Sequence, residues 1–160
     1  AGCASLDPPP VLGDGDRLSG RLAVRVEGDA SRSFSAAFDL QGRPERGLLA
    51  LASPTGSQLA QAAWSPQRVE LRTPQGARRY ADLAALAEDA LGEPVPLQAL
   101  FDWLAARPWP GAPSRPLDGG TGFEQLGWRV DTSRHADGLL VAERRDGDQP
   151  TVTVRIRLDA

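Results

Sequence analysis

The sequence predicts a mainly β domain in which antiparallel strands are interrupted by a pair of helices. Apolar and polar residues alternate in several short segments, and turns such as Gly28-Asp29 separate these segments about every 10 residues. Between residues 82 and 104 the period changes, and apolar residues recur every three or four positions, as on one face of a helix. The order strands, helix pair, strands therefore indicates a single β domain with a helical insert.

The strands before the helices are predicted from a two-residue period. The segment that starts at Gly20 alternates apolar residues with arginine, as a strand with one buried face does. The turn at Gly28-Asp29 leads to a second alternating segment, and Ser53-Pro54-Thr55-Gly56 separates two more. Such a series predicts an antiparallel meander that curls into a barrel or a sandwich. The further expected strands are Phe34–Phe38, Leu48–Ala52, Gln58–Trp64, Arg68–Thr73 and Ala77–Tyr80.

Two amphipathic helices are expected next. Asp82 can cap the first helix and Gly92 can end it, whereas Pro96 starts the second and Pro108 helps to stop it. Their apolar stripes need a partner, and the concave face of a curved sheet supplies one, which leaves a pocket between sheet and helices. The stripes are Leu83, Leu86, Ala87, Ala90 and Leu91 in the first helix and Leu97, Leu100, Phe101 and Leu104 in the second, with Trp103 at the edge.

The rest of the chain is predicted to return to the sheet. Trp109–Gly122 is rich in proline and glycine and is expected to be a long loop. Strands resume with Phe123–Asp131, Gly138–Arg145 and Thr151–Asp159. Asp146-Gly147-Asp148 is expected to be a hairpin turn and not a calcium loop, because the other ligands of such a loop are missing.

Composition excludes several classes of function. A single His and a single Cys rule out a disulfide framework and a zinc cluster, so we expect no metal and no cofactor. All 18 basic residues are arginine and are scattered among 21 acidic residues, which argues against a nucleic-acid partner. No apolar run approaches the roughly 18 residues of a membrane-spanning helix.

Candidate catalytic groups are few. His135 lies in a polar stretch that predicts a solvated loop, and Glu88 and Asp89 are expected on a solvated helix face. No serine stands in the context of a nucleophile elbow. Apolar surface remains, and the aromatic residues are either a cavity lining for an apolar ligand or simply core. The residues alone thus favour a non-enzymatic binding domain.

Residues 1–19 are expected to form an anchored tether ahead of a domain that spans residues 20–160. Ala1-Gly2-Cys3 resembles the end of a bacterial lipobox, after which a lipid is attached to the cysteine; the alternative is an unmodified tail cysteine. Ala4, in place of aspartate, favours the outer membrane over the inner one. Three prolines and a Gly/Asp repeat then predict a stiff spacer followed by a flexible hinge.

Several stretches together resemble the outer-membrane lipoprotein receptor family LolB. LLALASPTGSQLA (Leu48–Ala60) resembles the family's apolar strand, its Pro-x-Gly-Ser loop and the strand that follows. VELRTPQGARRYAD (Val69–Asp82) resembles the next hairpin, and LGEPVPLQALFDWLAARP (Leu91–Pro108) resembles the Pro-Leu-x-x-Leu-x-x-Trp-Leu helix. GRLAVRV (Gly20–Val26) and the closing alternation also fit, so the resemblance covers most of residues 20–160.

The resemblance implies an incomplete antiparallel barrel, which is a strongly curved sheet, with two or three helices over a hydrophobic cavity. It also implies a non-enzymatic receptor on the periplasmic face of the cell outer membrane, anchored by a lipid on Cys3. Such a receptor accepts lipoproteins from a LolA-type periplasmic carrier and delivers them to the membrane. A cavity keeps the acyl chains of the cargo out of water, where each CH₂ group costs about 0.8 kcal/mol. With no oligomer signal in the sequence, we expect a monomer.

Two groups of residues are the candidate sites. The expected cavity lining consists of Phe34, Phe38, Leu49, Leu51, Trp64, Leu71, Leu86, Leu100 and Trp103. The resemblance assigns cargo release at the membrane to the loop Pro54, Thr55 and Gly56.

The sequence also departs from the family pattern. Thr55 stands where the family loop usually presents an exposed apolar residue, Asp39 where relatives often have Trp, and Ala106 where Gly is common. Two alternatives follow: a periplasmic lipoprotein that binds another hydrophobic ligand, or a structural lipoprotein whose helices fill the sheet. A cavity between sheet and helices favours the receptor or the lipoprotein that binds another hydrophobic ligand. A filled interior favours the structural lipoprotein.

Overall fold

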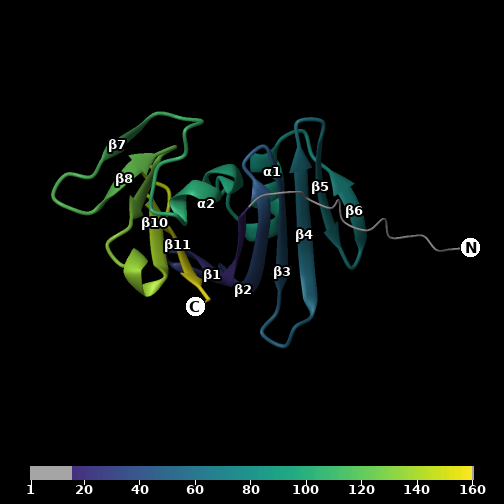
Figure 1. Ribbon diagram of the computed structural model, residues 1–160. Helices are drawn as coiled ribbons and strands as arrows, with labels where there is room; N and C mark the ends of the chain where they lie inside the picture. The colour runs from purple at the N-terminus through teal and green to yellow at the C-terminus, as the bar shows by residue number, and fades with distance from the viewer. Residues whose placement is uncertain (1–15, 160) are drawn as a thin grey trace, which may run out of the picture.

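The computed structural model describes residues 16–159 (Figure 1). The predictions for Cys3 and for residues 4–15 lie outside this range, whereas Asp16, within the expected tether, already belongs to a strand. The strands are β1 (Asp16–Val26), β2 (Asp29–Arg43), β3 (Arg46–Ala52), β4 (Gln58–Ser65), β5 (Arg68–Thr73), β6 (Gly76–Arg79), β7 (Ser114–Pro116), β8 (Gly122–Gln125), β9 (Trp128–Asp131), β10 (Leu139–Arg144) and β11 (Val152–Leu158). The helices are α1 (Leu83–Leu91), α2 (Leu97–Trp103) and the short 3₁₀ helix η1 (His135–Asp137).

One strand pair joins two meanders into a single 11-stranded sheet, in the order β6-β5-β4-β3-β2-β1-β11-β10-β9-β8-β7. β1 runs antiparallel to β11 from the Gly20–Leu158 pair to the Val26–Val152 pair. Within the described strand order, this pairing is the link between the meander that precedes the helices and the one that follows them.

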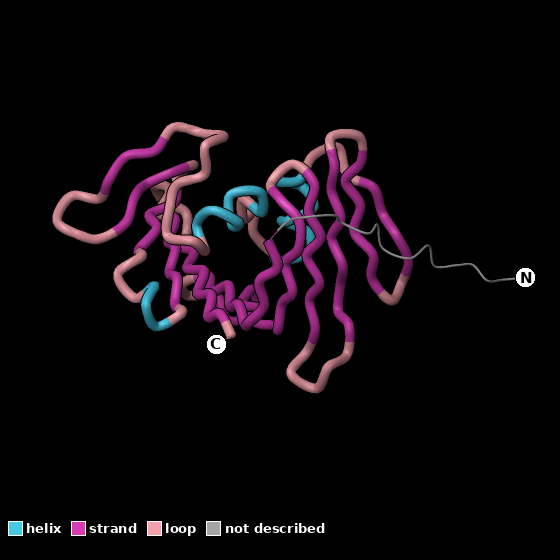
Figure 2. Tube along the Cα trace, viewed as in Figure 1, coloured by secondary structure: helices cyan, strands magenta, loops and turns pink. Residues whose placement is uncertain are grey.

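The sheet is strongly curved and remains open (Figure 2). Its terminal strands, β6 and β7, lie at opposite ends of the strand order and do not pair with each other. α1 and α2 lie on the concave side, between the two arms of the sheet. The predicted incomplete antiparallel barrel with helices on its inner face is therefore confirmed.

Alternation along the central strands decides which side chains face the helices. Leu22, Val24 and Val26 of β1 are buried, whereas Arg21 and Arg25 point to the other face and are exposed. β11 repeats this pattern and contributes three buried aliphatic residues. The inward side chains and the helices form one continuous apolar core.

Both ends of α1 and the start of α2 agree with the sequence-based expectation, whereas α2 ends at Trp103, five residues before Pro108, and Ala106 beyond it has a φ of 63°. The carboxylate of Asp82 accepts a hydrogen bond from the backbone N–H of Ala85 at 2.8 Å, and Gly92 ends α1 with a φ of 86°. α2 begins after Pro96. Trp103, expected at the edge of the stripe, is instead among the most deeply buried side chains. Neither helix in the described range is long and apolar enough to cross a membrane.

Two segments differ from the prediction. The expected loop before Gly122 contains β7, and the expected strand Phe123–Asp131 is divided into β8 and β9. The chain reverses at Leu126 and Gly127, whose φ angles of 56° and 82° are those of a type I′ turn. Leucine is uncommon at such a position, so the alternating pattern concealed the turn.

Gly20 allows β1 and β11 to approach closely. A Cβ atom at this position would lie 2.0 Å from the carbonyl oxygen of Arg157, which belongs to the backbone and cannot rotate away. We expect Gly20→Ala to lower the free energy of unfolding by about 1–3 kcal/mol, as overpacking does. Urea denaturation of both proteins measures the difference. The control is Gly120→Ala, where the added atom would meet its first neighbour at 3.7 Å; equal stability of the two variants would contradict the role of Gly20.

Candidate functional site

The residues predicted to line a cavity gather between the sheet and the helices. Phe34 is half-buried and packs against the core, and the other eight are buried within it. They come from six elements: the strands β2, β3, β4 and β5 and the helices α1 and α2. The concave face of the sheet thus brings together residues that are far apart in the sequence, and their role as a lining for a ligand stays a prediction.

Two tryptophans fix α2 on the sheet, and the first is Trp64 of β4. Its ring meets the ring of Phe101 edge-on, with 6.3 Å between the centroids. Its indole N–H donates to the carbonyl oxygen of Pro44 at 2.9 Å, and the amide of Gln98 donates to the same oxygen at 2.9 Å. The β2–β3 turn therefore holds both the strand and the helix that covers it.

The second tryptophan, Trp103, is held by a buried glutamine that the sequence analysis did not single out. Oε1 of Gln125 accepts from the Trp103 indole and from the backbone N–H of Trp109, both at 2.8 Å. Its Nε2 donates to the carbonyls of Trp109 and Ala112, at 2.7 and 2.8 Å. Gln125 thus uses its full amide capacity to bind α2 and the following loop to β8. The spacing in the sequence could have indicated that Gln125 is buried, because it follows the inward-facing Phe123 by two residues in a strand.

A buried carboxylate in the α1–α2 linker ties together two distant strands. Glu93 is only 5% exposed, and its two oxygens bind Arg32 of β2 at 2.5 Å and Arg144 of β10 at 2.8 Å. The guanidinium of Arg144 also lies over the ring of Trp128, 5.3 Å from its centroid. The linker therefore spans one end of the concave face. Sequence reasoning missed this role because both partners are more than 50 residues away.

An apolar groove of about 280 Å³ opens beside this linker. Its walls come from the start of α1, the linker, the start of α2 and the β8–β9 turn, and nearly all of its side chains are apolar. The lining residues are Leu83, Ala84, Pro94, Val95, Pro96, Leu97, Gln98, Trp109, Leu126 and Trp128. The groove borders the buried core, because Leu97 and Trp128 belong to both.

Leu126 combines exposure with backbone strain at this groove. Its side chain is 47% exposed, one of two exposed large apolar side chains among residues 17–159. Its φ of 56° lies in the left-handed region, which costs a residue with a Cβ atom roughly 1–2 kcal/mol. A strained, exposed leucine at the mouth of an apolar groove is a candidate for ligand contact.

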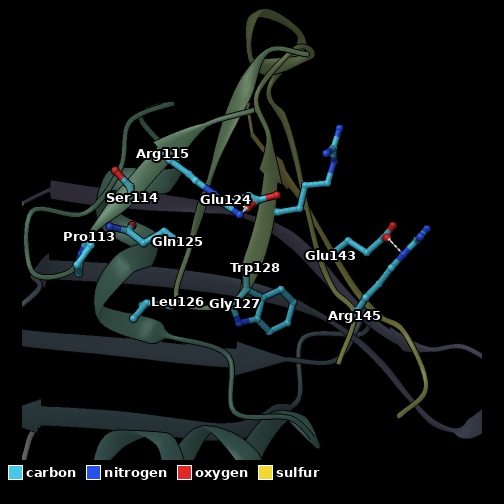
Figure 3. A pocket seen from close by; sticks show the side chains of 11 residues that line it. Pro113, Ser114, Arg115, Glu124, Gln125, Leu126, Gly127, Trp128, Glu143 and Arg145 are labelled. Carbon is cyan, nitrogen blue, oxygen red and sulfur yellow. Dashed lines mark hydrogen bonds and ion pairs between the residues drawn. The ribbon is translucent and has the colours of Figure 1, made fainter. Parts of the chain in front are cut away.

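A larger pocket of about 920 Å³ shares Leu126 and Trp128 with the groove, and charged side chains stand beside apolar ones in its walls (Figure 3). Arg115 binds Glu124 at 2.8 Å across β7 and β8, and Arg145 binds Glu143 at 2.6 Å beside β10. Charged walls of this kind do not favour an acyl chain. None of the nine predicted lining residues borders this pocket or the apolar groove.

The loop Pro54, Thr55 and Gly56 joins β3 to β4 and is exposed. The hydroxyls of Ser53 and Thr55 are hydrogen-bonded at 2.9 Å, and the Ser53 hydroxyl accepts from the backbone N–H of Ser57 at 3.1 Å. The loop is therefore a compact polar turn, and Thr55 uses its hydroxyl within it.

The titratable groups considered for catalysis lie apart from the groove lining. His135 is exposed on η1, with its Nε2 atom 3.1 Å from the carbonyl oxygen of Leu104. Tyr80 donates a hydrogen bond to Asp89 of α1, and burial together with this bond raises the pKa of Tyr80. Asp89 thus helps to hold α1 against the end of β6.

Comparison with known proteins relates this arrangement to one family. The family model described as "Outer membrane lipoprotein LolB" matches residues 17–160. An outer-membrane lipoprotein LolB of Ralstonia nicotianae is 37% identical, over 98% of this chain and 78% of the relative. Relatives with the same description come from Bordetella pertussis, at 37% identity over 91% of this chain and 80% of the relative, and from Cupriavidus metallidurans, at 29% over 99% and 89%.

The two ion pairs of Glu93 should stabilise the helical insert against unfolding. We expect Glu93→Gln to lower the free energy of unfolding by about 1.5–3 kcal/mol, because two arginines lose a buried charged partner. Urea denaturation measures this change. The matched control is Glu124→Gln. Glu124 and Arg115 form an exposed ion pair, and the loss of such a pair costs about 1 kcal/mol or less. If both variants lose the same stability, Glu93 is not the clamp that its contacts indicate.

Proposed function

The chain belongs to the LolB family of outer-membrane lipoproteins, and we propose that it takes up the acyl chains of lipoprotein cargo through the apolar groove between α1, α2 and the β8–β9 turn. The observation that carries this proposal is Leu126, which is exposed and strained at the mouth of that groove.

Family membership confirms the predictions that the resemblance made about class and location. The chain is an outer-membrane lipoprotein, and its family consists of non-enzymatic lipoprotein receptors. Partnership with a LolA carrier belongs to the family in general. We propose which surface of this chain meets the carrier and by which route the acyl chains enter.

The chemistry of the groove suits an acyl chain. Burial of each CH₂ group is worth about 0.8 kcal/mol, so an apolar wall next to the carrier lowers the cost of transfer. No covalent step is needed, because the acyl chains move towards the surface that covers them better. The exposed side chain of Leu126 gives the first apolar contact, and the rings of Trp109 and Trp128 continue the path inward.

The groove alone is small for this cargo. Its volume of about 280 Å³ is just below the roughly 300–1,000 Å³ of small-molecule sites. We therefore assign it the role of an entrance. The core that the groove borders contains eight of the nine predicted lining residues, and the ninth, Phe34, packs against it.

The polar loop favours a second candidate function. Because Thr55 is hydrogen-bonded to Ser53 and carries no large apolar side chain, the loop tip enters a membrane less readily than a leucine would. The alternative is a lipoprotein of the same shape that binds another hydrophobic ligand and delivers no cargo to the membrane. Transfer from a loaded carrier separates the two candidates.

The entrance is tested with Leu126→Asn in the chain that carries Cys3→Ser. Asparagine tolerates the left-handed conformation, so we expect this variant to be at least as stable as its parent. We expect it to capture labelled lipoprotein from a LolA-type carrier about fivefold to tenfold more slowly, because half a leucine side chain is lost from the contact.

Leu59→Asn is the matched control, since Leu59 is 37% exposed on β4 and does not line the groove. Equal slowing by both variants, or no capture by the parent chain, would contradict the proposal. Capture of a free fatty acid without capture of carrier-bound lipoprotein would favour the second candidate.

Delivery to the membrane is tested at the loop. We expect Thr55→Leu to speed the release of captured lipoprotein into liposomes, by up to about tenfold, because a leucine gains free energy on entering the bilayer. Thr121→Leu, at another exposed turn, is the control and should leave release unchanged. Unchanged release with Thr55→Leu would show that this loop does not act in delivery.

A further inference from the structure

Four arginines occupy the convex face of the central strand pair. Arg21 and Arg25 of β1 and Arg155 and Arg157 of β11 are exposed, and each alternates with buried residues that face the helices. The helices lie on the concave side of the sheet (Figure 2). The alternation of buried and exposed residues along β1 and β11 places these four side chains on the opposite face. None of the four takes part in an ion pair that we observe among residues 17–159. We call them the convex arginine patch.

The register places like charges together. Arg21 lies directly opposite Arg157 in the β1–β11 pair, so their Cβ atoms are about 5 Å apart. The residues opposite the patch on the outer neighbours are Ala37 on β2 and Leu139 and Val141 on β10. No acidic residue lies directly opposite Arg21, Arg155 or Arg157 in these strand pairs.

Glu27 is exposed and lies two residues after Arg25, so it carries a charge next to one end of the patch, whereas the other flanking carboxylates bind other residues. Asp39 binds Arg17 at 3.0 Å, and Asp159 accepts a hydrogen bond from the Ser19 hydroxyl at 3.2 Å. Glu143, two strands from β1, binds Arg145 at 2.6 Å. Two arginines directly opposite each other destabilise a sheet. The patch therefore weakens the strand pair on which the fold depends, although the chain as a whole has a net charge of −3.

We propose that the convex arginine patch binds the phosphate groups of anionic phospholipids and thereby turns the convex face of the sheet towards the membrane. Guanidinium groups bind phosphate with paired, directional hydrogen bonds, and two of them on adjacent strands can share one phosphate. The family's outer-membrane location places such a surface close to the chain, and β1 directly follows the segment that leads to Cys3.

This orientation leaves the opposite side free. The helices and the apolar groove then face the periplasm, where a soluble carrier can reach them. The inference rests on the membrane location of the family, and it does not depend on the groove being the acyl entrance. The two proposals can therefore fail separately.

The test is vesicle binding by the full chain with Cys3→Ser, so that no lipid anchor contributes. We expect the protein to co-sediment with vesicles of phosphatidylethanolamine and phosphatidylglycerol, and not with vesicles of phosphatidylethanolamine and phosphatidylcholine. We expect about 0.5 M salt to release it, because exposed charges are then screened. Each arginine near an anionic surface is worth about a fivefold change in partitioning, so Arg21→Gln with Arg157→Gln should weaken binding about 25-fold.

The matched control removes the same charge from the ends of the sheet. Arg79→Gln with Arg115→Gln changes one exposed arginine on β6 and one on β7, and binding should change less than about fivefold. Thermal unfolding is measured for both double variants. The patch variant should be at least as stable as the parent chain, because it removes a pair of like charges that face each other.

Three results would overturn the proposal. The first is no binding of the parent chain to anionic vesicles, and the second is equal weakening by the patch variant and the control. The third is unchanged vesicle binding by the patch variant together with slower cargo capture from the carrier, which would make the patch a protein-docking surface.

Discussion

The pairing of β1 with β11 is the constraint on which the rest of the molecule depends. It joins the two meanders, so the curvature that forms the concave face is continuous across it. The helices belong to the connection between the outermost strands β6 and β7, which must pass from one end of the sheet to the other. Covering the concave face is the compact route, and it buries the apolar stripes of both helices at the same time.

The helical insert is held at several points rather than by apolar packing alone. Glu93 fixes the linker to β2 and β10, Gln125 fixes the end of α2, and the carbonyl of Pro44 binds both Gln98 and Trp64. These polar contacts lie around the apolar interior, where they determine how the insert sits. Leu126 directly follows Gln125, which is one of these points, and lines the apolar groove. Strain at a place where the surroundings are otherwise well fixed is typical of a functional position.

Local sequence patterns predicted most of the helices and strands, but they did not predict the long-range contacts. Alternation at Leu22, Val24 and Val26 predicted a strand with one buried face, and Asp82 and Gly92 predicted the ends of α1. The turn at Leu126 was missed because leucine is not a turn residue, so only tertiary structure explains its φ angle. Glu93 and Gln125 were missed for another reason: their partners are distant in sequence, and no periodicity indicates which buried polar residue will meet them.

An open barrel has two free strand edges, and both edges of this sheet are poor templates for another strand. β6 has the sequence Gly-Ala-Arg-Arg and is exposed throughout, and β7 is a three-residue strand with an arginine and a proline. Short edges that carry positive charge or lack a backbone N–H resist the edge-to-edge addition that leads to aggregation. The sheet can therefore stay open at both ends without offering a second copy a strand edge to pair with.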